Sequence, residues 1–263
     1  MVEASANTRE PRARRRRDGQ LSLAMETVTA ARRPVIAGLS LRWQEIRACR
    51  CDGDASEDGE RALGLWVPDC DLDALVDELT QEQFERDDER MPYFGVVWPS
   101  AEALATRVLA GPPLDGSQTL DLGCGLGACG LAAARRGARV TFFDWEPRAL
   151  EIVAASAREQ GGPAAAFEFV VGDWRRPPLC GPFDLVLAAD VLYEPRNVPA
   201  VTTFLARHLG PGAEAWIADP GRPHTRELPA HAHAAGLELL DSETLPSRAH
   251  RLEITLLRLR RPT

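Results

Sequence analysis

The segment at residues 119–146, TLDLGCGLGACGLAAARRGARVTFFDWE, constrains the fold of this chain most strongly. An apolar run leads into a glycine-rich turn, an alanine-rich helical stretch follows, and a second apolar run ends in acidic residues. This order of strand, turn, helix and strand is typical of a nucleotide-binding βαβ unit, in which the turn lies against the ligand. The segment therefore predicts a Rossmann-like sheet that binds an adenosine-bearing cofactor.

The chain beyond residue 91 repeats the alternation of strands and helices, which predicts a doubly wound parallel sheet with helices on both faces. The last apolar run follows a connection too short for a crossover helix, so it should be antiparallel. We therefore predict an α/β fold with a mostly parallel seven-stranded sheet and an antiparallel last strand. The predicted strands are 118–122, 139–143, 166–171, 183–189, 213–219, 236–241 and 250–259, and the predicted helices are 127–137, 147–160, 197–209 and about 224–235.

Three parts of different composition divide the chain. Residues 1–32 are rich in arginine and lack apolar periodicity, so we expect a disordered tail, within which Met25 is a second candidate start. Residues 33–90 should form an N-terminal extension with a small β-hairpin and an acidic helix. Residues 91–263 should form the main domain, which opens with an apolar, strand-like entry and a helix that starts at Pro99.

Charge and cysteine content argue against several classes of protein. The net charge of -8 disfavours non-specific nucleic-acid binding, which needs a basic face. No apolar run reaches the roughly 18 residues of a membrane span. The cysteines have neither metal-binding spacing nor a signal peptide ahead of them, so we expect free thiols and no metal site. These features predict a cytoplasmic monomer that binds neither nucleic acid nor membrane.

The glycines of the turn fit more than one cofactor. Gly123, Gly125 and Gly127 let the backbone approach a ligand with no Cβ atom in the way, and the next helix offers its first amides. The same spacing fits the dinucleotide fingerprint, and Asp144 lies near the offset expected for a carboxylate that binds a ribose diol. From the loop alone, an NAD-dependent oxidoreductase therefore remains an alternative.

Acidic residues at two further strand positions distinguish between these cofactors. Asp121 precedes the loop, where a carboxylate can meet a cationic amino group but repels a pyrophosphate. Asp173 and Trp174 follow the third strand, where a carboxylate can accept from an adenine amino group and an indole can cover the ring. Together with Asp144 they suit a ligand with an amine, a ribose diol and an adenine. S-adenosylmethionine carries all three groups.

Four segments also carry a family resemblance: TLDLGCGLG, PYFGVVWPSAEALA, DLVLAADVLYEP and DPGRP at residues 219–223. Together they resemble class I methyltransferases of the seven-β-strand superfamily, and in particular the small protein lysine methyltransferases. They are similar to the lysine methyltransferases of the electron-transfer flavoprotein β subunit. PYF stands where that family tends to have PYW, and Ser100 and Ala101 where it tends to have two glycines.

The resemblance implies that residues 91–263 form an S-adenosylmethionine-dependent protein lysine methyltransferase domain, with the electron-transfer flavoprotein as the candidate protein partner. It implies that Asp190 and Tyr193 face the methyl-accepting nitrogen. Arg222 either binds a substrate carboxylate or fixes its loop. The residues that the resemblance places on the cofactor are Trp98, Gly123, Cys124, Gly125, Asp144, Trp174 and Ala189.

The acceptor chemistry leaves several alternatives open. A neutral amine is needed for methyl transfer, and keeping lysine neutral near pH 7.4 costs about 4 kcal/mol because its reference pKa is near 10.4. Asp190 is expected to orient this amine or accept its proton. Methylation of a small amine or of protein arginine, an NAD-dependent oxidoreductase, and a cofactor-binding regulator without turnover remain competing hypotheses.

Overall fold

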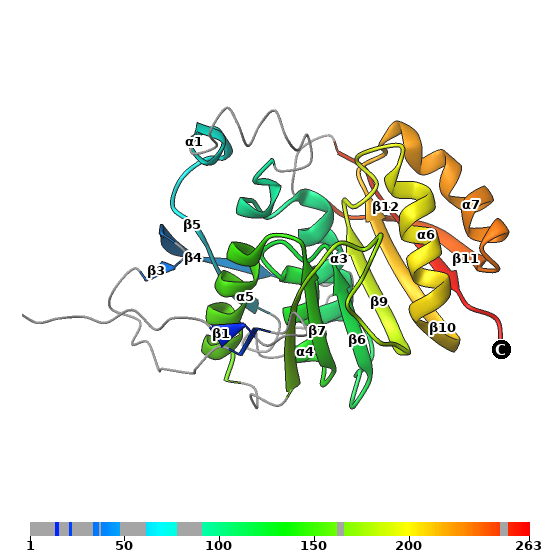
Figure 1. The fold of residues 1–263 in the computed structure, drawn as a ribbon, viewed down its shortest axis with the longest axis horizontal. Coiled ribbons are helices and arrows are strands. Elements are labelled where there is room, and N and C mark those ends of the chain that lie inside the picture. Colours follow the sequence, from blue (N-terminus) through cyan, green and yellow to red (C-terminus); the bar gives the residue numbers. More distant parts are fainter. Residues whose placement is uncertain are drawn as a thin grey trace, which may run out of the picture.

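The computed structural model describes residues 14–15, 21–22, 34–36, 38–47, 62–77, 91–161, 166–247 and 252–263. A 7-stranded sheet with the order β11-β12-β10-β9-β6-β7-β8 runs through the main domain (Figure 1). Neighbours from β10 to β8 are parallel, and β12 is antiparallel to both strands beside it. This confirms the predicted fold class. The strands are β6 (Gln118–Leu122), β7 (Arg139–Asp144), β8 (Phe167–Val171), β9 (Phe183–Ala189), β10 (Leu209–Asp219), β11 (Glu238–Leu245) and β12 (Ile254–Arg260).

Helices cover both faces of this sheet, and each face has its own apolar core. One face carries α3 (Pro99–Ala110), α4 (Ala128–Arg135) and α5 (Pro147–Glu159), and the other carries α6 (Asn197–His208) and α7 (Leu228–Ala234). The helix predicted at 224–235 is divided into a 3-10 turn, η3 (Pro223–Glu227), and α7. Pro229 explains the division, because proline lacks the amide that a continuous helix needs there. Within the described ranges, none of the helices combines the length and hydropathy needed to cross a bilayer.

The N-terminal extension forms an antiparallel sheet of β3 (Val35–Ile36), β4 (Leu39–Arg47) and β5 (Ala62–Pro68), which lies on the α5 side of the main domain (Figure 1). Leu63 and Leu65 are fully buried in the same apolar core as α5. Trp66 N donates to Ser156 Oγ at 2.9 Å, and Gln160 Nε2 donates to Gly64 O. The extension therefore shares its core with the main domain.

Parts of the predicted N-terminal organisation lie outside the described residues. Within the acidic segment, α1 (Leu72–Asp77) is helical, and residues 78–90 are not described. Of the predicted tail, only a short ladder between β1 (Arg14–Arg15) and β2 (Leu21–Ser22) is described.

The entry to the main domain is not the strand that its apolar residues predict. η1 (Tyr93–Gly95) is a 3-10 turn, in which Gly95 N donates to Pro92 O at 3.0 Å. Trp98 Nε1 also donates to Tyr93 O, at 2.8 Å, and so closes the segment on itself. The prediction was wrong because these aromatic residues line a cavity instead of a sheet face.

Candidate active site

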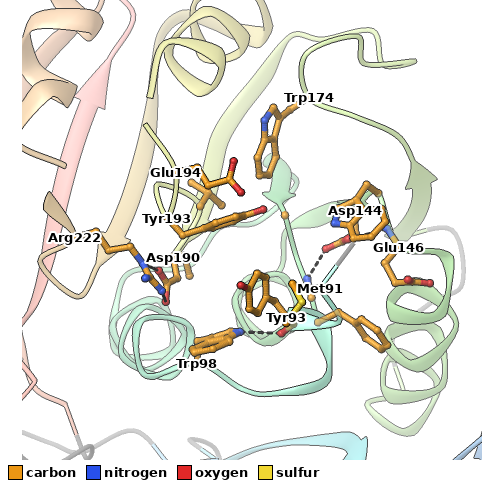
Figure 2. Close-up of a pocket in the computed structure, with 16 residues that line it drawn as sticks. Met91, Tyr93, Trp98, Asp144, Glu146, Trp174, Asp190, Tyr193, Glu194 and Arg222 are labelled. Atoms are coloured by element: carbon orange, nitrogen blue, oxygen red, sulfur yellow. Dashed lines mark hydrogen bonds and ion pairs between the residues drawn. The ribbon is translucent and has the colours of Figure 1, made fainter. Parts of the chain in front are cut away.

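A cavity of about 390 Å³ opens at the carboxyl ends of the central strands (Figure 2). Its walls come from the η1 segment, the loop after β6, the end of β7, and the segments that follow β8, β9 and β10. Ligands of open α/β sheets bind at this edge, near the point where the strand order reverses. The cavity is therefore the candidate active site.

The glycine loop presents bare backbone to this cavity. Gly123 has a φ of 64°, and a Cβ atom there would lie 3.1 Å from both Trp174 Cζ3 and Val191 Cγ1. Gly125 also lines the cavity, and its amide donates to Asp144 Oδ2 at 2.9 Å. The loop is thus fixed in a shape in which any side chain at Gly123 would be strained.

Two other predicted residues of this loop support it from behind. Cys124 is buried in the core, and its amide donates to Phe143 O at 3.1 Å. Gly127 has a φ of 76°, and a Cβ atom there would lie 2.7 Å from Val153 Cγ1. Neither is among the residues that line the cavity, so both pack the loop, and their cofactor contact stays a prediction.

Asp144 lines the cavity at the end of β7, as predicted for a ribose-binding carboxylate. Its Oδ2 accepts from Gly125 N, and its Oδ1 accepts from Glu146 N at 3.0 Å. Burial raises the pKa of Asp144 to about 6, although these amides lower it. Glu146 also lines the cavity and was missed, although a second acid two residues past the strand end was the available signal.

Asp173 does not point into the cavity, although its neighbour Trp174 lines it. The Asp173 carboxylate instead forms an ion pair with Arg175, with 2.8 Å between Nη2 and Oδ2. Asp173 Oδ1 also accepts from Arg175 N at 2.8 Å. In this orientation the carboxylate binds a cationic group two residues on, and its adenine contact stays a prediction.

Asp121 also lies outside the cavity lining, so its contact with a cationic amine stays a prediction. Its carboxylate points under α4, where Oδ2 accepts from Gly130 N at 2.7 Å, and the residue is 2% exposed. Burial raises the pKa of Asp121 to about 8, with a further increase from the charge of Asp144. Asp121 therefore joins β6 to the first turns of α4.

The raised pKa of Asp121 predicts a pH-dependent stability. A carboxyl group of this kind contributes stability that is fully present below its unfolded pKa, near 3.8, and is lost as the pH rises through about 8. Between these values the free energy of unfolding should fall by roughly 1 kcal/mol per pH unit relative to Asp121→Asn. Urea unfolding of both proteins at pH 5, 6, 7 and 8 measures this difference. Parallel pH curves would show that Asp121 ionises normally in the folded protein.

At the other end of the cavity, Asp190 follows β9 in a left-handed conformation with a φ of 56°. Its amide donates to Ala218 O at 2.9 Å, which fixes this unusual backbone. Arg222 binds both carboxylate oxygens of Asp190, with 2.5 Å from Nε to Oδ1 and 3.1 Å from Nη2 to Oδ2. This contact raises the pKa of Arg222 and supports the interpretation that Arg222 fixes local structure.

Aromatic rings surround Asp190 on its cavity side (Figure 2). Tyr93 packs edge-on against Tyr193, with ring centroids 5.6 Å apart, and against Trp98, at 6.0 Å. Tyr193, Trp98 and Ala189 were predicted and all line the cavity. Tyr93 was missed as a separate site residue, although it lies in the PYF segment that carried the resemblance.

This fold and this cavity resemble those of Rossmann-like methyltransferases. Residues 119–212 match the family model described as a methyltransferase domain. The structure of magnesium protoporphyrin IX methyltransferase from Synechocystis PCC 6803 with bound SAH has a similar fold, with a TM-score of 0.51 and 18% identity over 70% of this chain and 88% of that chain. Residues 119–212 are therefore similar to a methyltransferase domain, and the fold is shared with a solved methyltransferase.

Its curated relatives include named protein lysine methyltransferases. The electron transfer flavoprotein beta subunit lysine methyltransferase of Xenopus laevis is 30% identical over 147 residues, which cover 54% of this chain and 58% of that protein. Protein N-lysine methyltransferase METTL21A of Danio rerio is 35% identical over 136 residues, which cover 49% of this chain and 62% of that protein. The chain thus matches about three fifths of the length of these relatives.

Proposed function

We propose that this chain is an S-adenosylmethionine-dependent protein lysine N-methyltransferase. The observation that carries the proposal is the arrangement of one cavity, with bare glycine backbone and Asp144 on one side and Asp190 among aromatic rings on the other. The names of the two relatives support lysine as the acceptor. The electron-transfer flavoprotein β subunit is the candidate target.

The residues present fit the proposed cofactor. A volume of about 390 Å³ lies within the range of small-molecule sites, and the backbone at Gly123 leaves space that a Cβ atom would take. Asp144 and Glu146 would bind the ribose hydroxyls, and the Trp174 indole would cover the adenine. When bound, S-adenosylmethionine supplies a sulfonium methyl group, whose carbon–sulfur bond breaks as the new carbon–nitrogen bond forms.

The acceptor end of the cavity is suited to a lysine side chain. Tyr93, Trp98 and Tyr193 offer ring surfaces to its aliphatic stem. Asp190 orients the nitrogen, which must lose a proton to solvent before its lone pair can take the methyl group. The remaining requirement is that the amine be neutral at the moment of transfer.

Intact mass spectrometry tests the proposal directly. The chain is incubated with S-adenosylmethionine and electron-transfer flavoprotein, and the β subunit should gain whole methyl increments on lysine. The chain contains 31 Lys and Arg residues, all of them Arg, so none of the lysine label can come from its own side chains. A target variant with the modified lysine changed to arginine should stay unlabelled.

Each alternative has a distinct outcome. Label on arginine, or only in the low-mass fraction of a lysate, would overturn lysine as the acceptor. Calorimetry that detected binding of NAD but not of S-adenosylhomocysteine would indicate an oxidoreductase. Binding of S-adenosylhomocysteine with no methyl transfer to any lysate component would indicate a regulator.

A further inference from the structure

Arg222 is fixed at both ends by acidic residues. Its backbone amide and that of Gly221 donate to Asp219 Oδ1 at 2.7 and 2.8 Å, and Asp219 is fully buried. Its guanidinium binds both carboxylate oxygens of Asp190. Gly221, with a φ of 82°, makes the turn that brings the two contacts together. The Arg222 side chain is therefore a preformed part of the acceptor end of the cavity.

Arg222 lies on the far side of Asp190 from Asp144 (Figure 2). The side chain of Asp190 is 6% exposed, and that of Arg222 is 34% exposed. A bidentate ion pair of this kind carries no net charge, although a carboxylate has enough lone pairs to accept from another donor as well. An amine that reaches Asp190 from the cavity thus contacts a carboxylate whose charge is already balanced by the Arg222 guanidinium.

The charges around the acceptor end determine whether a bound amine is protonated, so the neutralisation of Asp190 by Arg222 affects the amine. A carboxylate in contact with an amine favours the ammonium form, whereas a nearby cation disfavours it. The groups that face the acceptor end are predominantly acidic or phenolic. From every element around it they are Asp190, Tyr193 and Glu194 after β9, Arg222 after β10, Tyr93 of η1, and Asp144 and Glu146 across the cavity. Asp219, buried at the end of β10, accepts from the Arg222 amide.

We propose that Arg222 is a positioning residue that, through Asp190, keeps the acceptor amine neutral enough to be methylated. This inference rests on the proposed function, because it concerns the amine substrate of that same site. Without Arg222, Asp190 would hold the amine as an ammonium ion, which has no lone pair for the methyl group. Arg222 therefore determines the pH range in which the enzyme works.

The pH dependence of kcat tests this role in the whole chain, with electron-transfer flavoprotein as substrate. Arg222→Gln should lower kcat at pH 7 by about tenfold and move the rising limb of the profile up by about one pH unit, so that its rate approaches that of the wild type near pH 10. Arg222→Lys, which keeps the charge and loses the fork, should lie between the two. Arg226→Gln, an exposed position in η3, is the matched control and should follow the wild type.

Two kinetic outcomes would overturn the proposal. An equal loss at every pH would mean that Arg222 only holds its loop, and faster turnover of Arg222→Gln at pH 7 would mean that the guanidinium competes with the substrate for Asp190. S-adenosylhomocysteine affinity and thermal unfolding of each variant show whether it is folded.

A second measurement needs no turnover, so it separates this inference from the proposed function. n-Butylamine, a lysine side-chain mimic, is titrated into the protein saturated with S-adenosylhomocysteine and followed by NMR. Its affinity for the wild type should rise roughly tenfold per pH unit between pH 7 and 9, because the neutral form is selected. Arg222→Gln should bind it more tightly at pH 7 with little rise. Wild-type affinity that does not rise with pH would overturn the proposal even if methylation is observed.

Discussion

Replacing Asp190 with asparagine should lower kcat for lysine methylation by about 100-fold or more, while S-adenosylhomocysteine affinity stays within about twofold of the wild type. Asparagine tolerates the left-handed backbone at this position, whose φ is 56°, so the local fold should persist. The carboxylate that orients the acceptor nitrogen would be gone, and the Arg222 guanidinium would remain without its anion. Single-turnover assays with labelled cofactor measure the chemical step alone.

Asp184→Asn is the matched control for this substitution. Asp184 lies at the start of the same strand, β9, and its Oδ2 accepts from Gln118 N at 2.8 Å. An asparagine oxygen can accept the same bond, so activity should be unchanged. If Asp190→Asn kept more than a tenth of wild-type kcat, Asp190 would not be the group that positions the acceptor.

Gly123→Ala should weaken the binding of S-adenosylmethionine and S-adenosylhomocysteine by about 10- to 100-fold. The new Cβ atom would lie 3.1 Å from Trp174 Cζ3 and Val191 Cγ1, so at least one of these cavity-lining side chains must move. The left-handed backbone at Gly123 adds a strain of about 1 kcal/mol for any residue with a side chain. Isothermal calorimetry gives the change in affinity.

Gly116→Ala is the control that separates the effect of the new Cβ contacts from the effect of the left-handed backbone strain. Gly116 has a φ of 73°, but a Cβ atom there would have no neighbour within 4 Å. Both variants should therefore lose stability in thermal unfolding, Gly123→Ala more than Gly116→Ala, and only Gly123→Ala should lose cofactor affinity. Equal affinities in the two variants would place the cofactor away from the glycine loop.

The strands and helices of the main domain were predictable because their patterns are local. β6 and β9 have the predicted bounds, 118–122 and 183–189, since strands buried on both faces are rich in apolar residues. The η1 segment was not predictable in this way. Its aromatic residues favour a strand by propensity, and the bonds that turn it, from Gly95 to Pro92 and from Trp98 to Tyr93, become visible only in three dimensions.

The candidate site shows the same division. Backbone features such as Gly123 and the strand-end residue Asp144 were predictable, because strand topology brings them to one edge, whereas Asp190 came from the family resemblance. The directions of side chains were not. Asp121 accepts a hydrogen bond from the amide of Gly130, and Arg222 forms an ion pair with Asp190, 32 residues away in the sequence. Such pairings depend on which donor happens to face each carboxylate in the folded chain.

The shared core of the N-terminal sheet and the main domain has a consequence for how this protein can be cut or recombined. Apolar side chains of β5 and α5 cover one another, and Trp66 N donates to Ser156 Oγ inside that contact. A fragment that began at residue 91 would lack β5, so the apolar face of α5 that β5 covers would be exposed to water. The Ser156 hydroxyl would also lose the hydrogen bond from Trp66 N. We therefore expect that residues 91–263 would not fold stably without the N-terminal sheet. A chimera with a foreign amino-terminal region would need apolar residues that cover the same face of α5.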